Sequence, residues 1–335
     1  MVLQRSFAIT PLSAGKREMT RFILIRLLQA AAVLAVMSFV VYTLIGLMPG
    51  DPIDLMISSN PHLTPADAAR LKALYGLDRP LIERYFAWAK AALTGDFGYS
   101  RLYLRPALEV LLPRLGNTAV LMAASLFCAY GLALPLGIAA ARKPGSAFDG
   151  AVNLLCFAGI SIPSFWLALM LILIFAASLG LLPAGGIATI GDGGLADRVR
   201  HLVLPVATLT LASMGAHLRY VRAAMIETLR QDFIRTARAK GASEMGVLAG
   251  HALRNALVPV VTVLALSFGS LFSGALVTET MFAYPGMGKL IYDAILGNDF
   301  NLALAGLLLA TAMVLVANIA ADIAYAAIDP RISLR

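Results

Sequence analysis

Residues 22–48 read FILIRLLQAAAVLAVMSFVVYTLIGLM, an apolar run with the length of a bilayer-spanning helix. Such a helix needs about 20 consecutive, mainly apolar residues, because lipid offers no water to satisfy backbone groups. The run exceeds the ~7–15 residues of a signal-peptide apolar region. It is followed by Pro49-Gly50-Asp51-Pro52, without a small-x-small cleavage site. We therefore predict a first membrane helix that stays in the protein.

The composition of the whole chain agrees with a lipid environment. Of 335 residues, 59% are hydrophobic and 14% are charged, and the mean hydropathy is +0.81. The net charge of +8 would suit nucleic acid, but Lys and Arg lie mainly in connections between apolar runs, which is a membrane-topology signal. We expect membrane lipid as a partner and no nucleic acid. Cys128 and Cys156 lie in apolar runs without CxxC spacing, which argues against disulfides or zinc.

Five further apolar runs are candidate spans, at 118–141, 151–179, 202–218, 256–278 and 302–328. The run at 202–218 is the weakest, because it is short and contains Pro205. Membrane helices tolerate proline where neighbours satisfy the freed backbone groups. The sequence therefore predicts an all-α membrane protein with six transmembrane helices.

The region between the first two spans is more polar and predicts a small helical cap on one membrane face. Thr64-Pro65 has the pattern of an N-cap followed by proline, opening a short helix that ends near Tyr75. A second helix fits residues 80–93, closed by a turn at 95–100. We expect the early N-terminal tail to be disordered, with Met19 as an alternative start. The predicted order is a tail at 1–21, the first helix at 22–48, the helical segment at 49–117, a five-helix core at 118–328 and a tail at 329–335.

Basic residues in the short connections predict the orientation, because Lys and Arg are enriched on the cytoplasmic side. The N-terminal tail is basic, and Arg142-Lys143 follow the second span. The connection at 219–255 carries Arg219, Arg222, Arg230, Arg235, Arg238, Lys240 and Arg254. Arg198 and Arg200, before the fourth span, oppose this pattern. Both termini and the 219–255 connection are predicted to be cytoplasmic, and 49–117 lies on the opposite side.

Within that connection, residues 231–244 read QDFIRTARAKGASE, which predicts two short helices broken at Gly241. Phe233, Ile234 and Ala237 form one expected apolar stripe, and the basic side chains point elsewhere. Gly241 suits a left-handed helix end, and Ser243 can cap the next helix. A small amphipathic helix between two spans can transmit a push from a partner protein. The alternative is a basic segment lying on anionic lipid.

The run at 232–259 resembles the cytoplasmic loop of permease subunits in the dipeptide and oligopeptide ABC importer family. One departure from the broader ABC-importer loop is Arg235-Thr236-Ala237 in place of Glu-Ala-Ala, and Val258-Pro259 lies farther from Gly241; the peptide branch shares both features. The resemblance runs from Arg21 to the end of the chain. Its other motifs are MPGDP at 48–52, YGLDRP at 75–80, GDFGYS at 95–100, SIPSFW at 161–166, ETMFAYPGMG at 279–288 and DPR at 329–331.

The resemblance implies a type I (MetI-like) ABC importer permease in the bacterial inner membrane, with 49–117 in the periplasm. It implies no cofactor and no ATP site in this chain. The implied partners are a second homologous permease subunit, two ABC ATPase subunits and a periplasmic solute-binding protein. Dipeptides, oligopeptides, glutathione, nickel chelates and glycosides all remain open as substrates. The implied ATPase-coupling residues are Phe233, Ile234, Arg235, Ala237, Arg238, Lys240, Gly241 and Glu244.

Two further features are candidates for the solute pathway or for gating. Pro163 should kink the third span, and Ser161 and Ser164 can bond the freed carbonyls; the alternative is a packing kink without solute contact. Asp322 lies inside the sixth span, and a membrane carboxylate points to function by default. Its place near the cytoplasmic end favours a structural ion pair or hydrogen bond instead.

Two other function classes are compatible with a membrane protein of this size. An ion-coupled secondary transporter would show acidic or His residues at mid-membrane together with internal repeats, and neither is clear in the sequence. A membrane enzyme would need a nucleophile and base, or metal ligands, facing one another. The sequence contains no HExxH, GxSxG or GxxxxGK[ST] pattern. We therefore expect no catalytic residue and no metal.

Overall fold

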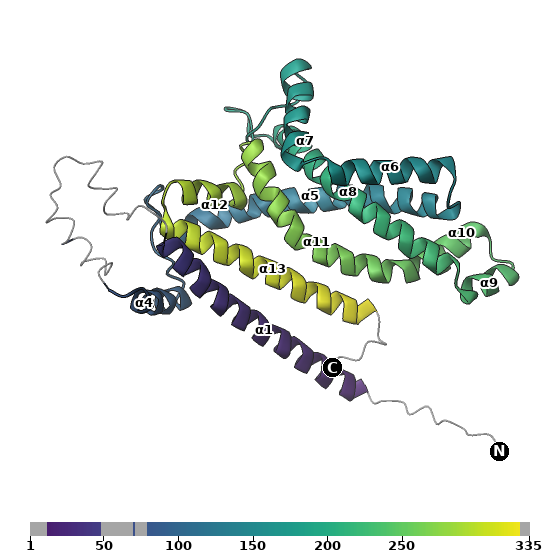
Figure 1. Ribbon diagram of the computed structural model, residues 1–335, viewed down its shortest axis with the longest axis horizontal. Coiled ribbons are helices and arrows are strands. Elements are labelled where there is room, and N and C mark those ends of the chain that lie inside the picture. The colour runs from purple at the N-terminus through teal and green to yellow at the C-terminus, as the bar shows by residue number, and fades with distance from the viewer. Residues whose placement is uncertain (1–11, 48–69, 71–78, 329–335) are drawn as a thin grey trace.

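The computed structural model describes residues 12–47, 70 and 79–328, and in these residues every regular element is helical. Long helices lie side by side along the longest dimension of the molecule (Figure 1). They are α1 (Leu12–Gly46), α5 (Ala107–Arg142), α8 (Leu195–Leu229), α11 (Leu253–Met281) and α13 (Phe300–Ile328). The shorter helices are α4 (Leu81–Leu93), α6 (Ala147–Ser161), α7 (Ser164–Leu171), η1 (Ile172–Ser178), α9 (Asp232–Ala239), α10 (Glu244–Gly246), η2 (Val247–Ala252) and α12 (Met287–Leu296).

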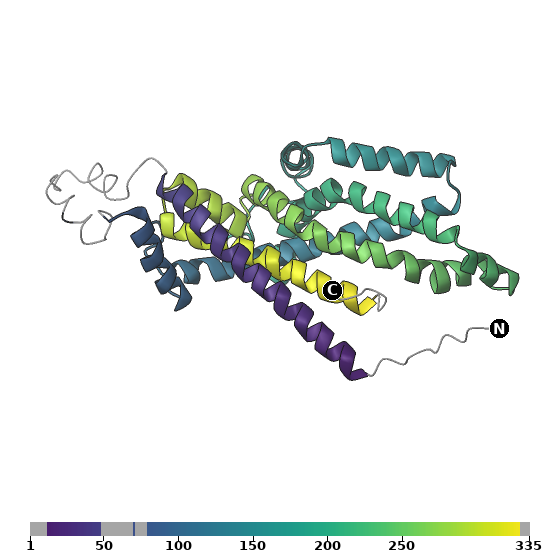
Figure 2. The same ribbon diagram turned by 60° about the horizontal axis from the view of Figure 1, so that its bottom comes forward.

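The two ends of this bundle carry different elements. The helices α9 and α10 lie at one end, and α4 and α12 lie at the other (Figures 1 and 2). The N-terminal end of α1 and the C-terminal end of α13 both point toward the end of the bundle that carries α9. We call these the α9 end and the α12 end.

Several helices have the length and hydropathy of membrane spans. In the described residues, four single helices qualify, within α1, α5, α8 and α13, and α6 with α7–η1 forms a fifth, bent candidate. The predicted fifth span at 256–278 lies within α11. The all-helical fold is therefore confirmed, and four or five of the predicted spans have the length and hydropathy to cross a membrane.

The predicted third span is more than kinked. The helix α6 ends at Ser161, and the chain turns by 100° before continuing as α7 and η1. Pro163 has no N–H to continue the helix, and Ile162 before it adopts an extended conformation with φ −87° and ψ 121°. Among the described residues, neither the Ser161 nor the Ser164 hydroxyl forms a hydrogen bond with the carbonyls that Pro163 frees, although the sequence analysis expected such bonds.

Other boundaries also differ from the sequence prediction. The helix α1 begins at Leu12, inside the predicted 1–21 tail, and the predicted disorder of the early tail concerns residues that lie outside the described ones. The helix α8 extends beyond the predicted 202–218 at both ends. The residues that form α12 were not predicted to be helical. The predicted helix at 80–93 is confirmed as α4. The predicted helix from Thr64 lies outside the described residues.

Small residues bring α8 against its neighbours. A Cβ atom at Gly215 would stand 2.5 Å from the carbonyl oxygen of Cys156 in α6, and one at Gly159 would stand 3.0 Å from that of Leu211 in α8. A Cβ atom at Gly137 of α5 would stand 2.7 Å from a side-chain carbon of Val221 in α8. In lipid, helices associate through close packing rather than through water exclusion, so these contacts favour a tight α5–α6–α8 group.

At the α12 end, the turn at 95–100 is anchored to the start of α13. The buried carboxylate of Asp299 accepts hydrogen bonds from Ser100 Oγ at 2.5 Å and from Leu102 N at 3.0 Å. Asn301 Nδ2 donates to the Tyr99 carbonyl at 3.0 Å. The helix α4 packs beside α1, where the hydroxyls of Tyr85 and Ser38 lie 2.8 Å apart. The segment after the first helix is therefore tied to both α1 and α13.

Candidate coupling site

The segment between α8 and α11 folds as two short helical arms around a glycine. The arm α9 begins after Gln231 and ends at Ala239, and Gly241 follows with a φ of +83°. This left-handed conformation is strained for residues with a side chain, which explains glycine here. Ser243 then accepts a hydrogen bond from Gly246 N at 3.2 Å and caps α10. The predicted helix break at Gly241 is confirmed.

The expected apolar stripe of α9 divides between two directions. Ile234 and Ala237 are buried, at 0% and 7% exposure, in a cluster with Met225 of α8 and Val247 of η2. Phe233 is instead 42% exposed. Successive helical residues differ in direction by about 100°, so Phe233 cannot share the inward direction of its neighbour. The prediction of one three-residue stripe was therefore wrong for Phe233.

Charged side chains of this segment lie on its exposed surface. Arg238 forms a two-pronged pair with Glu244, with nitrogen–oxygen distances of 2.9 and 3.2 Å, and so links the two arms across Gly241. Arg235 lies 3.5 Å from Asp232, and Lys240 is exposed. Exposed ion pairs contribute only about 0–1 kcal/mol, so their charges remain accessible to a partner.

The structure brings all eight predicted coupling residues into this segment. Met245, which the sequence analysis did not single out, directly follows Glu244 and is 70% exposed. Exposed methionine is suited to adaptable contacts because its side chain is flexible and polarizable. Phe233 and Met245 thus provide apolar contact area on an otherwise charged surface. The only signal in the sequence was an apolar residue directly after the Ser243-Glu244 cap.

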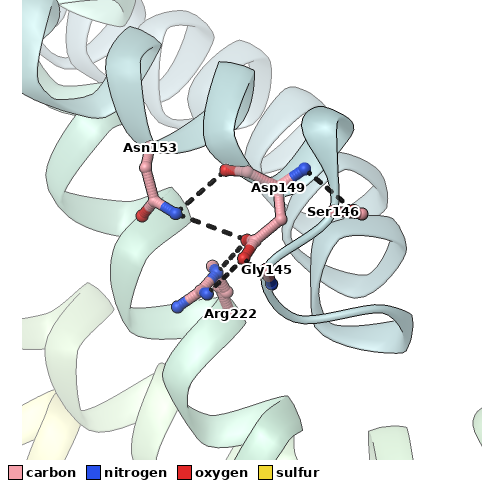
Figure 3. A network of polar contacts seen from close by, with 5 residues as sticks. All are labelled: Gly145, Ser146, Asp149, Asn153 and Arg222. Carbon is pink, nitrogen blue, oxygen red and sulfur yellow. Dashed lines mark hydrogen bonds and ion pairs between the residues drawn. The ribbon is translucent and has the colours of Figure 1, made fainter.

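An ion pair between buried Asp149 and partly buried Arg222 lies where α6 meets α8 (Figure 3). Arg222 of α8 donates to both carboxylate oxygens of Asp149, through Nε to Oδ1 and through a terminal nitrogen to Oδ2 at 2.7 Å. Gly145 N also donates to Oδ2 at 2.8 Å, and Asn153 Nδ2 donates to the Asp149 carbonyl at 2.9 Å. Ser146 caps α6 by accepting from Asp149 N at 3.3 Å. The sequence analysis counted Arg222 only as a topology charge and did not identify this network.

The four candidate pathway residues do not form one site. Ser161, Pro163 and Ser164 lie at the break between α6 and α7, whereas Asp322 lies on α13. Arg26 of α1 pairs with Asp322, with Nε 2.9 Å from Oδ2. Both side chains are partly exposed, and both lie toward the helix ends that point to the α9 end. Asp322 therefore has the basic partner that a structural role requires.

The ETMFAYPGMG motif encloses a buried carboxylate at the α12 end. Glu279 has no exposed surface and accepts from Thr118 Oγ1 at 2.5 Å and from Lys289 N at 3.0 Å. A Cβ atom at Gly286 would collide with this carboxylate, so glycine is required by space. Burial raises the pKa of Tyr284 to about 12, which keeps its phenol protonated as a donor to the Asn117 carbonyl at 3.2 Å. This motif is explained by packing around Glu279.

Two family models match separate parts of the chain. The model described as binding-protein-dependent transport system inner membrane component matches residues 133–334, and the model of the N-terminal part of such membrane components matches residues 19–103. The coupling segment lies within the first match, and the anchored turn at 95–100 lies within the second.

Curated relatives match over similar lengths. The oligopeptide transport system permease protein AppB of Bacillus subtilis is 37% identical, over 94% of this chain and 99% of the relative. The dipeptide transport system permease protein DppB of Escherichia coli K12 is 34% identical, also over 94% and 99%. A putative peptide permease protein of Brucella suis is 39% identical, over 94% and 100%.

Solved structures share the fold. A chain of the inward-facing MetNI methionine ABC transporter superposes with a TM-score of 0.55 at 20% sequence identity, covering 66% of this chain and 97% of that one. At this identity the likeness speaks for the fold alone. It agrees with the MetI-like helical architecture expected from the sequence.

Proposed function

The chain belongs to the family of binding-protein-dependent transport system inner membrane components, and on this premise we propose that it forms part of the membrane path of an ATP-driven importer for di- or oligopeptides. The relatives that it matches over 94% of its length are peptide permeases. This similarity favours peptides over glutathione, nickel chelates and glycosides. It gives no support to the ion-coupled alternative.

We propose six membrane spans with both termini in the cytoplasm of a bacterial cell. The sixth span is added by α11, which is 29 residues long. The start of α1, the end of α13 and the basic α9 segment all lie toward one end of the bundle (Figures 1 and 2). Because basic residues favour the cytoplasmic side, we assign the α9 end to the cytoplasm. The α12 end, with α4, then faces the periplasm.

In this arrangement the energy source is supplied by other chains. We propose a second homologous permease, two ABC ATPase subunits and a periplasmic binding protein as partners, consistent with the family description. The ATPase would contact Phe233, Met245 and the charged surface of the α9 segment. The described residues carry no cluster of His, Cys, Asp or Glu that could hold a metal, and the proposed role requires none.

The observation that carries this proposal is the way in which α9 joins the membrane helices. Ile234 and Ala237 pack in one cluster with Met225 of α8 and Ala256 of α11. A partner that pushes on the exposed residues of α9 therefore pushes on two long helices at once. Because packed interiors resist deformation, such a push moves the helices as rigid bodies.

The pathway candidates receive different proposals. We propose that Ser161, Pro163 and Ser164 mark a point where the third span changes direction beside the solute path, since discontinuous spans commonly form transport sites. Asp322 is proposed to hold α1 to α13 through Arg26 rather than to carry protons. An ion pair near a membrane interface costs far less than one at mid-membrane.

The test compares purified complexes in lipid that contain the ATPases, the second permease and the binding protein. Phe233→Asp should weaken ATPase association or abolish its stimulation by the binding protein. Gly241→Pro should do the same, because proline cannot adopt the φ of +83°. Phe86→Asp provides the control, since Phe86 is also an exposed phenylalanine but lies on α4. If Phe233→Asp and Phe86→Asp have the same ATPase association and the same stimulation by the binding protein, the α9 segment is better explained as a basic segment on the lipid surface.

A further inference from the structure

We propose that the Asp149–Arg222 ion pair couples α6 to α8, so that a displacement of the α9 segment reaches the break between α6 and α7. The inference rests on the proposed function and adds positioning residues to it. Arg222 lies in the 219–255 connection, but neither residue is among the eight predicted ATPase-coupling residues, and neither would touch the solute or ATP.

The position of Arg222 connects it directly with the coupling segment. Arg222 lies in the last part of α8, and about 10 Å of helix, at ~1.5 Å per residue, separates it from Leu229 at the end of α8. Between them, Met225 is fully buried in the cluster that holds Ile234 of α9. A displacement of α9 must therefore displace this part of α8.

The hydrogen bonds of Asp149 fix the orientation of Arg222 relative to α6. Arg222 uses two parallel donors, which fixes the guanidinium plane relative to the carboxylate. Asp149 is 3% exposed, and its remaining acceptor capacity is used by Gly145 N and by Asn153 Nδ2. The carboxylate therefore joins α8, the chain leading into α6 and the first turns of α6 (Figure 3).

From this ion pair, α6 follows α8 in antiparallel register up to the break. Cys156 meets Gly215, and farther along Gly159 meets Leu211, both at backbone contact distance. Just beyond Gly159, α6 ends at Ser161 and the chain bends by 100°. After the bend, Ala168 of α7 packs in a different cluster, with Leu204 of α8 and Phe282.

This geometry divides the third span into two parts with different attachments. The part before the break is held to the half of α8 nearest the α9 segment, and the part after it belongs to the cluster nearer the α12 end. A helix end followed by extended Ile162 is the kind of place where a hinge absorbs dihedral change. Movement of α9 would therefore change the angle between α6 and α7, provided that α6 follows α8.

The test uses the complete complex in lipid vesicles and measures peptide taken up per ATP hydrolysed. The informative variant is the double neutral Asp149→Asn/Arg222→Gln, because it leaves no unpaired charge in the buried site. We expect assembly and ATPase activity to persist, while uptake per ATP falls by about two- to thirtyfold, the range found when a coupling contact is lost. The matched control is Lys289→Gln/Asp293→Asn, which removes an ion pair of α12 at the opposite end and should leave the ratio unchanged.

A second measurement follows the two helices directly. Spin labels replace the exposed residues Phe148 of α6 and Tyr220 of α8, in a chain whose Cys128 and Cys156 are changed to alanine. The label distance should be the same in nucleotide-free and nucleotide-trapped wild-type complexes. In the double neutral variant it should differ between the two states.

The outcomes separate this inference from the proposed function. If the wild-type complex shows no ATP-dependent uptake, the proposed function fails. If the wild type transports and the double neutral variant keeps both the uptake ratio and a state-independent label distance, the ion pair is only structural and the inference is overturned. Should the double variant fail to assemble, Arg222→Lys takes its place under the same criteria, because lysine keeps the charge but cannot donate two parallel bonds.

Discussion

Replacing Ile234 with alanine should detach α9 from the bundle while leaving the membrane helices intact. Ile234 has no exposed surface, and with Ala237 it makes up the buried side chains of α9 in the described structure. Truncating a buried isoleucine to alanine costs about 2–5 kcal/mol. Because α9 is short, this cost should fall on its local opening. A loss of about 3 kcal/mol raises the open population roughly 150-fold, at 1.4 kcal/mol per factor of ten.

Amide hydrogen exchange of the purified chain in lipid measures that opening. The amides of α9 should exchange about 30- to 4,000-fold faster in Ile234→Ala, the range that about 2–5 kcal/mol implies, whereas those of α5 and α13 should be unchanged. Phe233→Ala is the control, since its side chain is 42% exposed and contributes little to packing. It should leave exchange in α9 near the wild-type rate. Exchange of Ile234→Ala amides within about threefold of wild type would refute the packing argument.

Three other substitutions test individual contacts. Gly241→Ala should destabilise the turn after α9 by about 1–2 kcal/mol through its φ of +83° alone, since a Cβ there meets nothing within 4 Å. Weaker binding of the ATPase subunits would show this destabilisation. Gly286→Ala should destabilise the fold, because its Cβ would collide with the buried Glu279 carboxylate and force that side chain to shift. A lower midpoint of thermal unfolding in detergent would show this. Ser100→Ala should destabilise the chain by about 1–3 kcal/mol by leaving buried Asp299 one donor short; an unchanged midpoint would mean that this turn is not anchored as described.

The sequence was sufficient for features that depend on local chemistry. Apolar runs located α1, α5 and α13, because membrane spans are recognised by length and hydropathy. The helix α4 and the break at Gly241 followed from capping residues and glycine, whose preferences act within a few residues. The sequence analysis expected an ion pair or hydrogen bond for Asp322 but did not identify Arg26 as its partner.

Features that depend on contacts between distant segments were not predictable in this way. Asp149 and Arg222 are distant in the sequence and meet only because α6 and α8 pack in antiparallel register. Pro163 signalled a kink, but the 100° turn depends on how α7 packs after the break. Phe233 was placed in one apolar stripe with Ile234 and Ala237, but the spacing of residues on a helix does not say which of them face the bundle, and Phe233 is exposed.

The energy source of peptide uptake tests the central claim most directly. Vesicles would contain this chain with its partner permease and ATPases, supplied with binding protein, labelled peptide and ATP. The account predicts peptide accumulation that requires ATP, persists when ionophores collapse proton and sodium gradients, and stops when the ATPases are omitted. Accumulation that follows an imposed ion gradient without ATP would contradict it.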